Sequence, residues 1–239
     1  MTEALKCLAG WPGWDRCQEV GAHFGYQWDS ADPAHGKIPN LKGEDEFSQP
    51  WTGETAIRTA ARSGSVMVGN EWSLKGWTID KHCDLLRYFF DIALDENPAC
   101  YVLGPNDITW EPVSGWRGFA NIERIANRYK QRFGQVPPFR GFGFHAYHYP
   151  GGVNLVKMIH WAATEARRVY GDIDIHITET GSLMGEQAAL ASLPLIQEGL
   201  AAGIAAWFWF VTRCPDHRFC SIWDDGWSLT LLGRAYKAL

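Results

Sequence analysis

The stretch Gly141–Glu179 decides the fold of this chain. Its first part, Gly141–Tyr149, reads GFGFHAYHY and has the apolar, aromatic character of a buried strand. Val153–Tyr170 then carries apolar residues at helical spacing, and Asp174–Glu179, DIHITE, is a second short strand. A strand, a helix and another strand in succession are typical of a parallel sheet.

The same alternation extends in both directions along the chain. Short apolar runs predict eight strands, at Lys6–Trp11, His23–Trp28, Lys37–Leu41, Val66–Glu71, Cys100–Leu103, Gly141–Tyr149, Asp174–Glu179 and Gly203–Phe210. Helical patterns fall at Gly53–Arg62, Ile79–Leu94, Phe119–Phe133, Val153–Tyr170 and Glu186–Ala201. We therefore predict one (β/α)8 TIM barrel, a single catalytic domain spanning residues 1–239.

The chain is slightly shorter than the ~250 residues typical of such barrels. The segments between the first three strands, such as Asp29–Gly36, leave room only for a turn or loop. We expect a compact barrel with helices reduced or missing there. The rival fold is an open doubly wound sheet, but the chain has neither the glycine fingerprint nor the lysine loop of nucleotide-binding sheets.

Composition excludes several partners. The 239 residues carry a formal net charge of -5, so neither nucleic acid nor an anionic membrane is an expected partner. No apolar run approaches the ~20 residues of a membrane span. The first residues lack a signal-peptide core, so we expect a cytosolic protein or an exported one whose signal has been removed.

Aromatic residues and cysteines leave alternatives open. Thirteen Trp, 8 Tyr and 12 Phe either fill the space between sheet and helices or line a cleft for a ligand with flat apolar faces, such as a sugar. Six cysteines show no zinc-site spacing, and we predict free thiols, although Cys214 and Cys220 have a spacing that would close a small loop in an exported protein.

Two glutamates, Glu71 and Glu179, each end an apolar run. The carboxyl ends of barrel strands form the active-site face, and a carboxylate buried there is costly unless it is paired or functional. Either glutamate alone has an ordinary explanation, an ion pair with an arginine at the rim. Together, among aromatic strand ends, they indicate glycoside hydrolysis, which needs one carboxylic acid and one carboxylate.

Several motifs then resemble one known clan of enzymes. The motifs are Asn70-Glu71, Gly143–Tyr149, Thr178–Gly181, Ala206–Trp209 and the ending Leu229–Tyr236. Taken in this order, they resemble strands four to eight, and the close of the domain, in the retaining (β/α)8 glycoside hydrolases of clan A. Small size and Val68–Glu71 most resemble glycoside hydrolase family 128, which includes endo-β-1,3-glucanases. The resemblance runs from about Val66 to the C-terminus.

The resemblance implies a retaining hydrolase that cleaves within a β-linked glucan or related polysaccharide, acting as a monomer without cofactor or metal. It implies that Glu71 is the acid/base, that Glu179 is the nucleophile and that Asn70 binds the sugar 2-hydroxyl. It further implies that Tyr147 or His145 orients a carboxylate and that Trp209 or Trp207 forms the floor of the central subsite. Trp72, in a loop after a strand, is a further candidate for stacking on sugar.

Trp72 also marks a departure, because the family usually has Pro after Asn-Glu. It keeps open a second hypothesis, a carbohydrate-binding barrel without catalysis. A third hypothesis is a metal-dependent barrel hydrolase that uses His145, His148 and His176. Asn106-Asp107 either forms a turn or reaches the substrate, and we favour the turn.

The alternation in the strand before Glu179 raises a question of its own. Ile175 and Ile177 share parity with Glu179, so an inward-facing Glu179 would place Asp174 and His176 against the helices unless a bulge intervenes.

Overall fold

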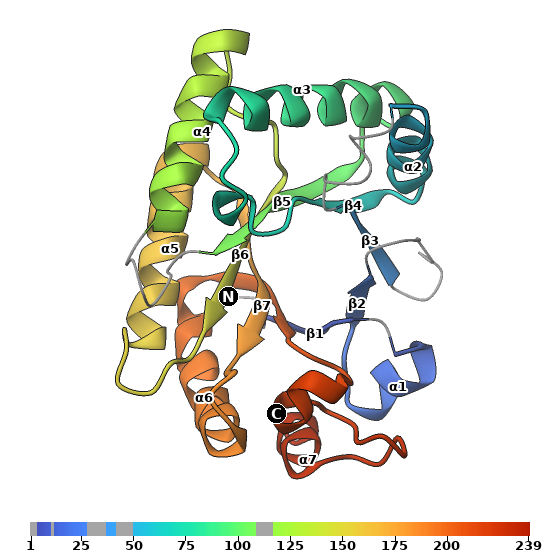
Figure 1. Cartoon of the computed structure of the whole chain (residues 1–239), viewed down its shortest axis with the longest axis vertical. Helices are drawn as coiled ribbons and strands as arrows, with labels where there is room; N and C mark the ends of the chain where they lie inside the picture. The colour runs from blue at the N-terminus through green and yellow to red at the C-terminus, as the bar shows by residue number, and fades with distance from the viewer. Residues whose placement is uncertain (1–3, 11, 28–36, 42–49, 109–116) are drawn as a thin grey trace.

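The alternating pattern folds as a closed parallel barrel, in which the strands pair in chain order and β8 pairs with β1 (Figure 1). The structure is a computed structural model that describes residues 4–10, 12–27, 37–41, 50–108 and 117–239. The strands are β1 (Leu5–Ala9), β2 (Phe24–Gln27), β3 (Lys37–Leu41), β4 (Ser65–Val68), β5 (Tyr101–Ile108), β6 (Gly141–Tyr147), β7 (Asp174–Gly181) and β8 (Ile204–Trp209). The predicted (β/α)8 barrel is confirmed.

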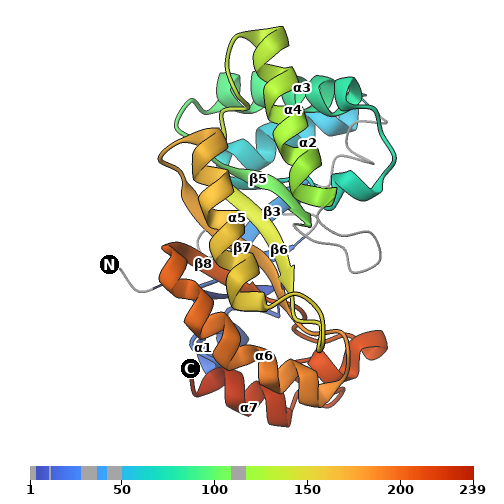
Figure 2. The same ribbon diagram turned by 90° about the vertical axis from the view of Figure 1, so that its left-hand side faces the viewer.

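Helices cover the outside of the barrel. The α-helices are α1 (Trp14–Glu19), α2 (Pro50–Arg62), α3 (Ile79–Glu96), α4 (Arg117–Phe133), α5 (Leu155–Tyr170), α6 (Glu186–Gly199) and α7 (Leu231–Lys237), and the 3₁₀ turns are η2 (Trp72–Leu74), η3 (Leu200–Ala202) and η4 (Pro215–Cys220). Figure 2 shows α4, α5 and α6 following one another along one side of the barrel.

The first connection is shortened, as predicted. In the part of the β1–β2 connection that the structure describes, the chain forms the short helix α1, which has six residues, whereas α2 has 13 and α3 has 18. The predicted loop Asp29–Gly36 lies outside the described residues.

The apolar residues form two layers separated by the sheet. The larger layer lies between strands and helices and includes Ile175, Ile177 and Trp207. The smaller layer fills the barrel and consists of Cys7, Ala9, Tyr26, Met67, Leu103, Ala206 and Phe208. Successive residues of a strand face opposite sides, so Ala206 and Phe208 point inward and their neighbours point to the helices.

Close packing inside the barrel requires glycine in β6. A Cβ atom at Gly143 would lie 2.0 Å from Asn106 Oδ1 and 2.9 Å from Thr178 Cγ2. Asn106 is itself fixed, because its side-chain amide donates to the carbonyls of Val68 at 3.0 Å and Leu103 at 3.3 Å. The absence of a side chain at Gly143 therefore makes room for the residue that ties β4 to β5.

Two further predictions can be compared with the described residues. They contain no disulfide, and Cys214 and Cys220 are not joined. None of the helices in the described ranges combines the length and the apolar character that crossing a bilayer requires.

Replacement of Gly143 by alanine should destabilise the protein by about 1–3 kcal/mol, because the added methyl group overpacks the barrel against Asn106. Urea unfolding measures the change. Gly226→Ala is the control, since its Cβ would meet only Asp224 Oδ1 at an ordinary 3.4 Å. Equal stability of the two variants would contradict this account of the barrel interior.

Candidate active site

Glu71 is placed by an unusual backbone at the end of β4. Its φ of 50° and ψ of 41° lie in the left-handed region, which non-glycine residues adopt only at a cost of order 1–3 kcal/mol. The Glu71 N–H donates to the carbonyl of Asn106 at 3.1 Å. Gly69, two residues earlier, has a φ of 85°, and a Cβ there would lie 2.4 Å from the Pro105 oxygen. Contact with β5 thus holds this conformation.

Glu179 reaches the barrel interior through a β-bulge in β7. Phe144 of β6 pairs with Ile177, but His145 pairs with Glu179, so Thr178 is an extra residue on the β7 side. Ile175 and Ile177 face the helices and are fully buried. The bulge lets the next carboxylate point inward despite its parity, which answers the question that the alternation raised.

Two tyrosine hydroxyls hold the Glu179 carboxylate. The Tyr26 hydroxyl donates to Oε1 at 2.8 Å, and the Tyr147 hydroxyl donates to Oε2. Burial and the charge of Glu179 raise the pKa of both tyrosines well above the ordinary value, so both remain protonated donors at neutral pH. Only 7% of the Glu179 side chain is exposed. Hydrogen bonds to both oxygens stabilise an ionised carboxylate at a depth where an unpaired one would be costly.

His145 lies between the two glutamates. Its Nδ1 is 3.3 Å from Glu71 Oε1 and 3.6 Å from Glu179 Oε2. Burial lowers the pKa of His145, but the charge of Glu179 and the hydrogen bond to Glu71 outweigh it, and the pKa ends above 6.5. A Glu71 oxygen, a Glu179 oxygen and a His145 ring nitrogen all lie within 4.8 Å of one another.

The structure thus brings together four of the predicted residues: Glu71, His145, Tyr147 and Glu179. Asn70 precedes Glu71, and its Oδ1 is buried with no hydrogen-bond partner in the described part of the chain. Its binding role stays a prediction, as do the catalytic roles of the glutamates. Glu71 has 31% of its side chain exposed, so it is the more accessible of the two carboxylates.

The three tryptophans predicted to bind sugar are placed elsewhere, and that prediction is wrong. Trp207 and Trp209 are 1% and 0% exposed and pack against Tyr236 of α7, with ring centroids 5.4 and 6.2 Å away. The Trp209 indole N–H also donates to the carbonyl of Cys220 at 2.9 Å. The physical reason is strand alternation, because Ala206 and Phe208 take the inward positions.

Trp72 is also buried, at 1% exposure, in the layer between strands and helices. Its ring centroid lies 5.8 Å from that of Trp77 and 5.6 Å from that of His82. The first turn after Glu71, η2, carries this ring into the core. Trp72 is therefore not accessible for stacking on a sugar.

Sequence reasoning missed residues that the structure places at the site. Tyr26 sits near the tip of the second strand, and its position in a predicted strand was the available signal. Phe210, which directly follows β8, packs against Tyr147 with ring centroids 6.0 Å apart. Asn106 and Asp107, interpreted as a turn, are buried residues of β5. That interpretation is wrong, because β5 continues to Ile108.

The histidines predicted as metal ligands do not converge. Tyr101 of β5 contacts His176, at 2.8 Å, and Asp174, at 2.9 Å, near the start of β7. Among the described residues, the set with metal-ligating atoms close together is Glu71, His145 and Glu179. Both oxygens of Glu179 in this set already accept tyrosine hydrogen bonds.

Comparisons with known proteins support the fold. No family model matches the sequence, and no curated protein matches it. A family 128 (subgroup II) endo-β-1,3-glucanase from Sorangium cellulosum has a similar structure, with a TM-score of 0.70, 15% identity and 98% of each chain covered. A family 128 (subgroup III) curdlan-specific exo-β-1,3-glucanase from Blastomyces gilchristii, solved in complex with glucose, is also similar. The TM-score is 0.72 at 15% identity, and 98% of each chain is covered.

A family 128 (subgroup IV) endo-β-1,3-glucanase from Lentinula edodes is similar as well, with a TM-score of 0.66 at 15% identity, over 97% of this chain and 98% of that one. The chain therefore shares a compact barrel fold, over nearly its full length, with β-1,3-glucanases of this family.

His145 should titrate above the ordinary value of 6.5, and Glu71→Gln should lower its pKa, because the variant removes a negative charge beside the ring. NMR titration of the imidazole nitrogens measures both. Since the folded-state pKa is raised, the protonated ring contributes stability at pH below 6.5 and loses it as the pH rises through the folded value. His176, with its pKa lowered to about 4 by burial, is the internal control. A wild-type His145 that titrates below 6.5 would contradict this geometry.

Proposed function

We propose that this chain is a retaining glycoside hydrolase that cleaves within a β-linked glucan, with a β-1,3-glucan as the substrate class. The observation that carries the proposal is the approach of the Glu71 and Glu179 carboxylate oxygens to within 4.8 Å. Retaining enzymes hold their two carboxyl groups about 5–5.5 Å apart, whereas inverting enzymes need about 6.5–9.5 Å to admit a water. The glucanases that share the fold support the substrate class.

The environments of the two glutamates suit two different roles. Glu179 is held in one orientation by the hydroxyl groups of Tyr26 and Tyr147, as a nucleophile must be. Glu71 is more exposed and contacts the Nδ1 of His145, so it can exchange a proton with a leaving group or water. All of these side chains lie in the one barrel, and we propose that this barrel is the catalytic domain and acts as a monomer.

The reaction follows in two displacements. Glu179 forms a bond to the anomeric carbon while Glu71 gives its proton to the departing glycosidic oxygen. The ionised Glu71 then removes a proton from water, which attacks the same carbon and releases Glu179 as a carboxylate. When Glu179 becomes an ester it loses its charge, and the two tyrosine hydrogen bonds weaken; they strengthen again as the carboxylate returns.

The non-catalytic alternative depended on Trp72 in place of the usual Pro after Asn-Glu. Trp72 packs into the core, and Glu71 beside it still contacts His145, which supports the catalytic proposal over this alternative. The metal-dependent alternative predicts loss of activity with a chelator. Our proposal predicts full activity in its presence.

Replacing either Glu71 or Glu179 by glutamine should lower turnover of a soluble β-1,3-glucan at least 10³-fold, the order expected for loss of a nucleophile or of general acid/base catalysis. Reducing-sugar release measures this, and oligosaccharide products indicate internal cleavage. Glu198→Gln, an exposed change on α6, is the control. Azide should rescue Glu179→Ala and give a glycosyl azide of inverted configuration. Near-normal activity in either glutamine variant would reject the proposal.

Removing the Tyr26 hydroxyl should lower kcat about 10–100-fold with little change in KM, because the hydroxyl orients Glu179 without touching substrate. Steady-state kinetics of Tyr26→Phe measure the split. Tyr170→Phe is the matched control, since the Tyr170 ring packs against Phe139 and Phe142, away from the glutamates. An unchanged kcat in Tyr26→Phe would show that Tyr147 alone suffices.

A further inference from the structure

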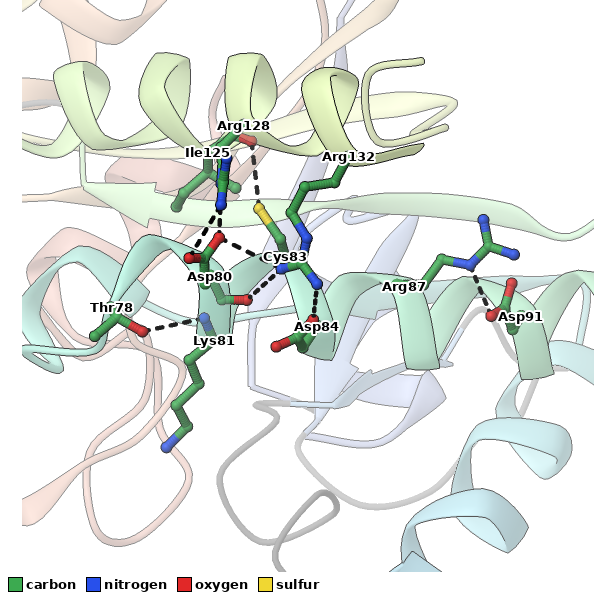
Figure 3. A network of polar contacts seen from close by, with 10 residues as sticks. All are labelled: Thr78, Asp80, Lys81, Cys83, Asp84, Arg87, Asp91, Ile125, Arg128 and Arg132. Atoms are coloured by element: carbon green, nitrogen blue, oxygen red, sulfur yellow. Dashed lines mark hydrogen bonds and ion pairs between the residues drawn. The ribbon is translucent and has the colours of Figure 1, made fainter. Parts of the chain in front are cut away.

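A pocket of about 590 Å³ lies outside the barrel, between the N-terminal turn of α3 and the middle of α4. We call it the α3–α4 pocket; its walls include Trp77, Asp80, His82, Arg124, Asn127 and Arg128. Its volume falls within the ~300–1,000 Å³ of ligand sites. Neither Glu71 nor Glu179 belongs to it. Figure 3 shows α3 running below α4, with Asp80 and Arg128 meeting between them.

The charges along this interface are largely paired. Arg128 Nε donates to Asp80 Oδ1 at 2.7 Å, and Arg132 Nη2 donates to Asp84 Oδ1 at 2.6 Å (Figure 3). The N-terminal end of α3 is also capped, because Thr78 Oγ1 accepts a hydrogen bond from the Lys81 backbone N–H at 3.2 Å. With Asp80 in the first turn, this helix terminus does not favour an anion.

The remaining polar groups in the pocket do not pair with one another by hydrogen bonds or ion pairs within the described residues. Arg124 is exposed and has no ion pair within the described ranges, and Asn127 is exposed one turn later. His82 is 3% exposed, and its Nδ1 has no hydrogen-bond partner among the residues that the structure describes. Burial lowers the pKa of His82 to about 4, so the ring is neutral at pH 7. Trp77 is half-buried; its ring centroid lies 5.5 Å from that of His82, and the Lys81 ammonium lies over the ring, 4.1 Å from its centroid.

An indole, a neutral imidazole, a guanidinium and a carboxamide together suit a ligand with both hydroxyl groups and flat apolar faces. A pyranose ring has these properties and carries no charge that Asp80 would repel. We propose that the α3–α4 pocket is a second carbohydrate-binding site, which holds a glucosyl unit of the same β-glucan at a distance from the catalytic glutamates. The inference rests on the proposed function for the identity of the glycan.

The pocket is physically continuous with the catalytic loop. Trp72 packs against the loop that carries Glu71, because a Cβ atom at Gly69 would lie 3.4 Å from the Trp72 ring. The Trp72 ring also packs against those of the pocket residues Trp77 and His82. Trp77 lies six positions after Glu71 in the chain, so their Cα atoms lie at most about 21 Å apart. A glucan several units long spans that distance, whereas a single glycoside does not.

Binding must be measured without turnover, so every protein in the titrations carries Glu179→Gln. Calorimetry with a soluble β-1,3-glucan compares this background with one that also carries Arg124→Ala and Asn127→Ala. We expect about tenfold weaker binding, the effect of losing one hydrogen bond to a charged group. Lys130→Ala, which removes an exposed cation from the same helix outside the pocket, is the matched control and should leave affinity unchanged.

A second measurement separates this proposal from the catalytic one. In the otherwise native enzyme, Arg124→Ala with Asn127→Ala should raise KM for the polysaccharide and leave hydrolysis of an aryl β-glucoside unchanged. Unaltered glucan affinity in the pocket variant, or no binding by the Glu179→Gln background, would overturn the proposed second binding site, whatever substrate the enzyme hydrolyses. Retained turnover in Glu71→Gln would overturn the catalytic assignment, while the affinity loss would still support the pocket.

Discussion

A carboxylate at the mouth of a barrel must be hydrogen-bonded, because burial otherwise makes its charge too costly. Glu179 meets this constraint with one tyrosine hydroxyl on each oxygen. The two donors come from β2 and β6, so the requirement can be met only when the sheet has closed. Formation of the site and closure of the barrel are therefore the same structural event.

The position of the second glutamate, Glu71, depends on its backbone conformation rather than on side-chain hydrogen-bond donors. Asn106 contributes twice: its carbonyl accepts the Glu71 N–H, and its side-chain amide donates to the last residue of β4, Val68, and to Leu103 within β5. Gly143 leaves the space that Asn106 occupies. A left-handed Glu71 is thus maintained by contacts in the barrel interior, which is where proteins hold strained residues at functional sites.

The abundance of tryptophan left two interpretations open, a filled core and an aromatic cleft. Trp72, Trp207 and Trp209 follow the first, because all three lie in the layer between strands and helices. Among the residues that the structure describes, the aromatic rings near the glutamates include Tyr26, Tyr147 and Phe210. Indole rings are large, and the gap between a barrel and its helices is the largest apolar space that this fold offers.

The sequence by itself determined the alternation of strands and helices, the shortened first connection and the placement of Glu71 and Glu179 at strand ends. These features are local, since they depend on spacing and on residues near one another in the chain. Only the tertiary structure decided which way the side chains face. The bulge at Thr178 exists because β7 must pair with β6, and Tyr26 reaches Glu179 from 153 residues away. Register and long-range contact depend on neighbouring strands, which no local pattern specifies.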